Sequence, residues 1–145
     1  MKKTIVCFLL GFGAACQPSD ISPDAIESFK YTSVTGFTGM VTTVRVTRQQ
    51  TILQLGYNKP KICTTATSPQ EWQDLVDVAR LEEFRKYPSV TNVGCCDRGT
   101  ESILIEGQGK SYPATNEFLP RDSTSIGKLA IRLRLRVNNR IKICP

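Results

Sequence analysis

Histidine is absent from this 145-residue chain, and no hydrophobic run in it is long. Without histidine the chain cannot form a Ser-His-Asp triad, a Cys-His pair, an HExxH site or any metal site with histidine ligands. The longest apolar run, at residues 5–12, is about half of the roughly 20 residues that cross a bilayer, so no transmembrane helix is expected. These absences favour a protein that is not an enzyme and that holds no metal or cofactor.

The first fifteen residues have the organisation of an export signal. A charged start with Lys2 and Lys3 precedes the apolar run, and small residues ending at Ala15 provide a cleavage site. Small residues directly before Cys16 also resemble the lipobox of bacterial lipoproteins, in which that cysteine is acylated. We expect residues 1–15 to be removed, Cys16 to be lipidated and residues 16–26 to form a tether. The protein would then be a membrane-anchored lipoprotein of the bacterial cell envelope, facing the periplasm or the cell surface. Ordinary cleavage after Ala15 without lipidation is the alternative.

Four cysteines remain after the signal and Cys16 are set aside, and an oxidising compartment favours disulfides between them. They are Cys63, Cys95, Cys96 and Cys144. A bond between the neighbours Cys95 and Cys96 needs a strained ring, so we expect each to form its own bridge, one to Cys63 and one to Cys144. The sequence leaves open which joins which. A four-thiolate zinc site, which lacks any CxxC pair, and a vicinal redox pair are the functional alternatives.

Residues 27–145 have the pattern of a single α+β domain. Runs rich in Thr, Val and aromatic residues predict strands at 27–34, 40–48 and 51–57. Gly107-Gln108-Gly109 predicts a tight hairpin between strands at 100–106 and 110–114. The consecutive apolar residues at 103–105 predict a central strand that is covered on both faces. The sheet is therefore expected to be mostly antiparallel, with about five strands.

Two segments predict helices that pack against this sheet. Ser68, Pro69 and Glu71 form a capping box, and apolar residues follow at 72, 75, 76 and 79, so a helix begins there and ends before Pro88. We expect Trp72 to pack in the core. Residues 126–137 fit both a helical stripe and an alternating strand, and the start signal at 122–123 favours the helix. The expected fold is a disulfide-stapled α+β domain with two helices.

Basic residues are concentrated near the C-terminus, where residues 121–145 hold seven basic residues and one acidic residue. Such a segment can bind anionic lipid, glycan or an acidic protein, although a solvated helix face explains it equally well. Nucleic acid is not an expected partner, because the chain is exported and no aromatic residue is interleaved with the arginines. The candidate basic patch consists of Arg132, Arg134, Arg136, Arg140 and Lys142.

The loop Thr35-Gly36-Phe37-Thr38-Gly39 lies between Thr-rich strands, and a helix, a strand at 102–106 and a closing apolar helix follow it. This order resembles the emfourin-type protein inhibitors of thermolysin-like metalloproteases and small envelope lipoproteins that share a Gly-Phe-x-Gly loop. The resemblance spans roughly residues 29–137. The family loop usually reads Gly-Gly-Phe-Ala-Gly, so Thr35 and Thr38 depart from it, and the four cysteines are not part of the family pattern. The resemblance implies a small domain that works by binding, with Gly36, Phe37 and Gly39 in the contact loop.

The sequence therefore predicts a monomeric, lipid-anchored, non-enzymatic binding module that presents a loop to a protein, with an extracytoplasmic protease as the candidate partner. The alternative is an envelope structural or anion-binding protein that acts through the basic C-terminal segment. An enzyme would need converging carboxylates, such as Asp97 with Glu101 or Glu106 with Glu117. Nothing in their spacing predicts that they converge.

Overall fold

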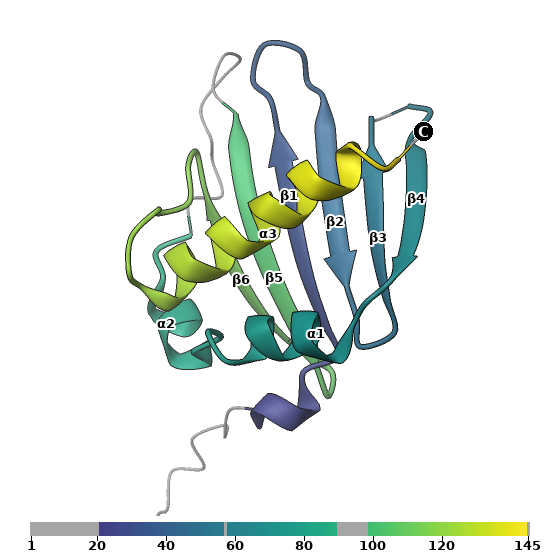
Figure 1. The fold of residues 1–145 in the computed structure, drawn as a ribbon. Coiled ribbons are helices and arrows are strands. Elements are labelled where there is room, and N and C mark those ends of the chain that lie inside the picture. The colour runs from purple at the N-terminus through teal and green to yellow at the C-terminus, as the bar shows by residue number, and fades with distance from the viewer. Residues whose placement is uncertain (1–20, 57, 90–98, 145) are drawn as a thin grey trace, which may run out of the picture.

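The computed structural model describes residues 21–56, 58–89 and 99–144 as an α+β fold (Figure 1). Its sheet has six antiparallel strands in the order β4-β3-β2-β1-β5-β6, one more than the sequence predicts. The strands are β1 (Ser28–Val34), β2 (Val41–Val46), β3 (Gln50–Leu55), β4 (Lys61–Ala66), β5 (Thr100–Gly107) and β6 (Lys110–Asn116). The helices are α1 (Pro69–Val76), α2 (Leu81–Lys86) and α3 (Ser125–Ile141), and a short 3-10 helix, η1 (Pro23–Ala25), precedes the sheet.

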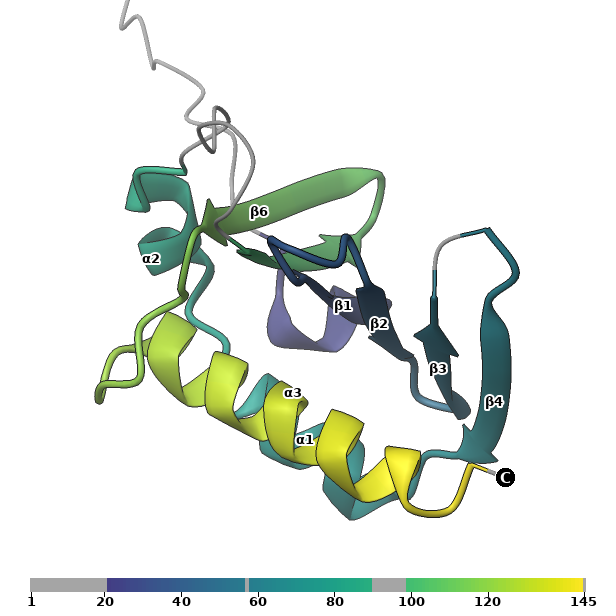
Figure 2. The same cartoon turned by 90° about the horizontal axis from the view of Figure 1, so that it is seen from above.

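Helices α1 and α3 cover the same face of the sheet, and α3 crosses the strands diagonally (Figures 1 and 2). The core lies between these layers, with Phe29 and Val44 of the sheet and Leu129 of α3 fully buried. Along β5, Ile103 and Ile105 are buried, whereas Leu104 between them is only half-buried. The prediction that this strand is covered on both faces is wrong, because these helices lie on one side of the sheet only.

The strand register follows the alternation of apolar residues. Phe29 lies opposite Val46 on one side and Ile105 on the other, so buried side chains of three strands form one row. The predicted hairpin between β5 and β6 is confirmed. Its two turn residues, Gln108 and Gly109, have φ values of 49° and 70°, which a two-residue turn with right-handed strand twist requires.

The capping box at the start of α1 is confirmed. The Glu71 N–H donates to Ser68 Oγ at 3.2 Å, and the Ser68 N–H donates to Glu71 Oε2 at 2.8 Å. Trp72 packs in the core as predicted, with its ring centroid 5.3 Å from that of Phe29. The expected single helix is divided into α1 and α2, because buried Ser125 stabilises the break between them. Its hydroxyl accepts from the Arg80 N–H and donates to the Val78 carbonyl.

The last segment is a helix, as favoured from the sequence, and not a strand. Leu133 and Val137 are buried, whereas Ile131 and Leu135 are exposed, which is the pattern of one helical face. Thr124 caps the helix, because its hydroxyl accepts from the Gly127 N–H at 3.1 Å. Within the described ranges, no helix has the length and hydropathy needed to span a membrane.

Strand β4 is the one strand of the six that was not predicted from the sequence. It lies at the edge of the sheet, pairs with β3 only, and has exposed side chains at alternate positions. Its large aliphatic residue, Ile62, is 61% exposed, so the strand carries no alternation of buried apolar residues that a sequence pattern could reveal. Backbone pairing with β3 and a covalent bond to the end of the chain hold it in place.

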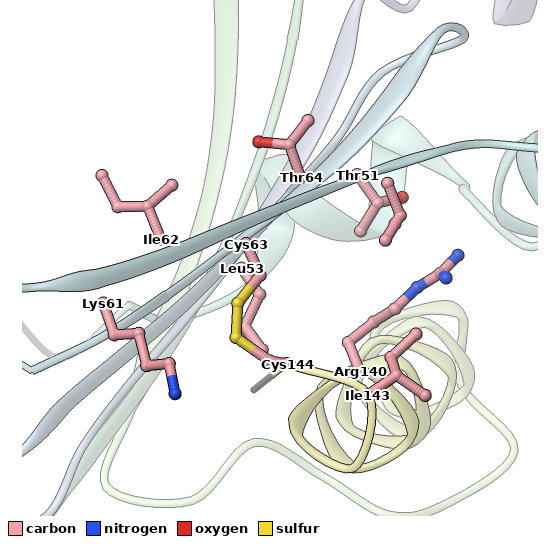
Figure 3. A pocket seen from close by; sticks show the side chains of 10 residues that line it. Thr51, Leu53, Lys61, Ile62, Cys63, Thr64, Arg140, Ile143 and Cys144 are labelled. Atoms are coloured by element: carbon pink, nitrogen blue, oxygen red, sulfur yellow. A yellow bond between two sulfur atoms is a disulfide. The ribbon is translucent and has the colours of Figure 1, made fainter.

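That covalent bond is a disulfide between Cys63 of β4 and Cys144, which follows α3 (Figure 3). Their Cα atoms are 5.9 Å apart, within the usual range for a disulfide. The prediction that Cys63 and Cys144 bond separately to Cys95 and Cys96 is therefore wrong. The diagonal path of α3 brings the end of the chain to the helix-covered side of β4. Cys95 and Cys96 lie outside the described residues.

Candidate functional site

The loop between β1 and β2 presents the most exposed of the large hydrophobic side chains in the described part of the chain. Phe37 is 92% exposed and Met40 is 52% exposed. An aromatic side chain left in water adds nothing to the hydrophobic stabilisation of the fold, and burying it against another surface is favourable. The loop is therefore the candidate contact site, which is the role that the resemblance implies for Phe37.

Hydrogen bonds hold this loop in one shape. The Thr35 N–H donates to the Met40 carbonyl at 3.0 Å, and the Gly39 N–H donates to the Thr35 carbonyl at 2.9 Å. Thr35 Oγ1 also accepts from the Met40 N–H at 3.1 Å and lies 2.5 Å from Thr38 Oγ1. Thr35 and Thr38 are thus the residues that cross-link the loop.

Glycines shape the loop more than they extend its contact surface. Gly39 has a φ of +60°, a left-handed conformation that a residue with a side chain adopts only with strain. Gly36 is half-buried at the base of the loop, next to Gly99. A Cβ atom on Gly99 would lie 2.7 Å from the Val34 carbonyl oxygen, so only glycine fits there. Gly99 was not among the predicted site residues, because an isolated glycine gives no signal of what it packs against.

The basic C-terminal residues do not form one exposed patch. Arg132 donates to the Asp74 carbonyl, Arg136 to the Glu71 carbonyl and Arg140 to the Glu71 carboxylate, so these three side chains are held against α1. Burial lowers the pKa of Arg136, and nearby Glu71 opposes that shift. Lys142 is exposed, whereas Arg134 points into the sheet.

Arg134 belongs to a buried network around Glu101. The Glu101 carboxylate accepts from the Tyr31 hydroxyl at 2.6 Å, from the Leu119 N–H at 2.9 Å and from Arg134 Nε at 2.9 Å. Burial raises the pKa of Glu101, but the bonds from Arg134, Tyr31 and Leu119 outweigh it, so the pKa lies below its ordinary value. Burial, aided by Glu101, raises the pKa of Tyr31 to about 12. This arrangement stabilises the fold and commits the Glu101 carboxylate to hydrogen bonds within it.

The carboxylate pairs considered from the sequence are not brought together in the described structure. Glu106 lies at one end of β5, where it accepts from Ser28 and Arg45. Glu117 follows the opposite end of the β5–β6 pair, because Asn116 lies across from Glu101. Asp97 lies outside the described residues.

The Tyr31 phenol gives the network a measurable pH dependence. Because its pKa in the folded protein is about 12, above its ordinary value of 10, the neutral phenol stabilises the fold fully below pH 10. That contribution is lost as the pH rises from about 10 to about 12. We expect an absorbance titration near 295 nm to show a phenol that titrates near pH 12. We expect Tyr31→Phe to remove that titration step. Titration of every phenol near 10 in the folded protein would contradict the network.

Sequence comparison places the chain in no family. No protein-family model matches it, and no curated protein is significantly similar to it. The likeness to emfourin-type inhibitors thus stays a prediction that depends on the loop motif and on the order of elements.

Proposed function

We propose that this protein is an exported, lipid-anchored, non-enzymatic binding protein that docks onto a protein partner through its β1–β2 loop. The observation that carries the proposal is the 92% exposure of Phe37 on a loop that its own hydrogen bonds hold in shape. Phe37 enters an apolar pocket of the partner, and Met40 contacts the rim of that pocket. The strands behind the loop supply a stiff support.

The energetics of docking favour such a loop. Burying a phenylalanine side chain contributes roughly 1.5–3 kcal/mol, and aromatic anchors in well-packed pockets dominate many interfaces. A loop that is already ordered loses little conformational entropy on binding, so more of this gain is retained as affinity. The hydrogen bonds of Thr35 and Thr38 therefore support binding although their side chains need not touch the partner.

The resemblance to emfourin-type inhibitors suggests an extracytoplasmic metalloprotease of the thermolysin type as the partner. An inhibitor anchored through Cys16 would stay at the envelope. Anion binding by the basic C-terminal segment has less support, because Arg132, Arg136 and Arg140 are held against α1. Arg134 is held by Glu101.

Replacing the anchor residue tests the proposal directly. We expect the purified protein to inhibit a thermolysin-like metalloprotease and Phe37→Ala to weaken inhibition about tenfold to a hundredfold, from the lost burial of the ring. The measurement is the inhibition constant in a peptide-cleavage assay. The matched control is Phe118→Ala, because Phe118 is also exposed, at 69%, but lies outside the loop.

Two results would contradict the proposal. One is equal inhibition by the Phe37→Ala protein and the unchanged protein. The other is a combination of two negative findings. No such protease is inhibited, and a photoreactive benzoylphenylalanine at position 37 forms no protein adduct in cells that export the chain. The same photoreactive residue at position 118 controls for random encounters.

The anchor has its own test. We expect mass spectrometry of the mature protein to find an N-terminal, acylated Cys16. We also expect Cys16→Ser to release the protein from the membrane fraction. One acyl chain binds a membrane only weakly, so stable retention indicates that more than one is attached. A mature N-terminus with an unmodified Cys16 would exclude lipid anchoring and leave the docking proposal unaffected.

A further inference from the structure

The two edges of the sheet differ in whether their backbone groups are available. Along a strand of an antiparallel sheet, the backbone N–H and C=O groups of one residue point toward one neighbouring strand. Those of the next residue point toward the opposite side. The Thr67 N–H donates to the Gln49 carbonyl at 3.0 Å, one pair beyond the β3–β4 ladder. It follows that residues 63 and 65 bond to β3, whereas the N–H and C=O groups of Ile62, Thr64 and Ala66 face outward.

The β6 edge is blocked against a further strand. The same rule can be followed from β1 to β6. Thr35 bonds to Met40 across β1 and β2, and the registers of β1 with β5 and of β5 with β6 then assign alternate residues of each strand in turn. On this assignment the backbone groups of residues 111, 113 and 115 of β6 face outward. Pro113 has no N–H, and the Thr115 N–H already donates to Ser89 Oγ at 3.3 Å. Pro113 thus interrupts the row of donors that a pairing strand would need.

The β4 edge has no such protection. Ile62, Thr64 and Ala66 include no proline, and within the described residues no strand or side chain bonds to their outward backbone groups. The Cys63–Cys144 disulfide fixes this strand from the helix-covered side and so keeps the edge in an extended, ordered form. Edges of this kind pair readily with an additional strand.

We propose that β4 accepts an extended segment of a protein partner as a seventh strand, and that this segment alternates apolar and acidic residues. Residues of the added strand that lie opposite Ile62 and Thr64 place their side chains beside exposed Ile62, where apolar groups are favoured. The intervening residues lie on the other face, where β4 meets the end of α3. The proposal rests on the proposed function, because it adds a second contact to a protein-binding protein.

The side of β4 that faces α3 determines the acidic part of that pattern. A cavity of about 270 Å³ borders the edge, and its lining includes Lys61, Arg140, Ile143 and the disulfide (Figure 3). Lys61 lines this cavity and is exposed, so an incoming carboxylate meets positive charge there. Charge complementarity at an interface favours this ligand over a basic or neutral one.

Positive charge also disfavours a second copy of the chain as the occupant. Antiparallel pairing of two β4 strands about Thr64 would place both copies of α3 on the same face of one continuous sheet. Each helix is followed by exposed Lys142, two residues before the disulfide-bonded Cys144, so the two ends would lie side by side with like charges. Like charges in that position are unfavourable, so the occupant is a partner's strand.

A blocked heptapeptide of alternating valine and glutamate is the probe. We expect it to bind the oxidised protein, with amide shifts in a ¹⁵N spectrum concentrated at residues 61–67, and the same peptide with lysine for glutamate to bind at least about tenfold more weakly. Thr64→Pro removes an outward N–H without breaking a bond to β3, and we expect it to weaken binding about tenfold or more. Thr64→Val keeps that N–H and is the matched control.

Two further variants keep the test decisive. Lys61→Glu reverses a charge without touching the backbone, and we expect it to exchange the preference between the two peptides even if Thr64→Pro unfolds the strand. Phe37→Ala should bind the peptide unchanged, which separates this proposal from docking by the loop. No peptide binding, equal binding by Thr64→Pro, or a dimer in sedimentation that Thr64→Pro dissociates would overturn the inference.

Discussion

Glu101 is the point at which the sheet, the closing helix and the connection between them are joined. Its carboxylate accepts hydrogen bonds from Tyr31 of β1, from Arg134 of α3 and from the Leu119 N–H. A buried carboxylate without partners would be costly, whereas one with a cation and two further donors remains ionised and fixes the positions of all its neighbours. The network therefore specifies where α3 lies on the sheet as well as stabilising it.

The rest of the architecture depends on that placement. Because α3 crosses the strands diagonally, its last turn reaches β4, where the disulfide joins Cys144 to Cys63 (Figure 1). The two flanks of the helix are used differently, since Arg134 meets Glu101 while Arg132, Arg136 and Arg140 meet α1. The β1–β2 loop and the β4 edge extend from this scaffold without a helix of their own. Phe37 on the loop and the outward backbone groups of β4 are therefore available to a partner.

Much of the fold could be predicted from local sequence signals. The capping box at Ser68, the hairpin at 107–109 and the helical stripe of α3 each depend on residues close together in the chain, and all three are confirmed. Strand β4 was not predicted because Ile62 points into solvent. The disulfide pairing was not predicted because it depends on the diagonal path of α3 across the sheet. The sequence did contain a signal that three of the arginines lie against a neighbouring element. Arg132, Arg136 and Arg140 are spaced four residues apart, which places them on one flank of α3, beside its apolar stripe. The resemblance implied Phe37 as a contact residue, whereas the cross-links made by Thr35 and Thr38 depend on three-dimensional geometry.

The central claim is that Phe37 is presented on a loop whose shape exists before any partner arrives. Backbone ¹⁵N relaxation of residues 35–40 in the free, oxidised protein measures this directly. The hydrogen bonds at Thr35, Gly39 and Met40 predict order parameters of about 0.85, the value of rigid backbone. Values below about 0.6 across the loop would mean that it is ordered only on binding, and would contradict the account.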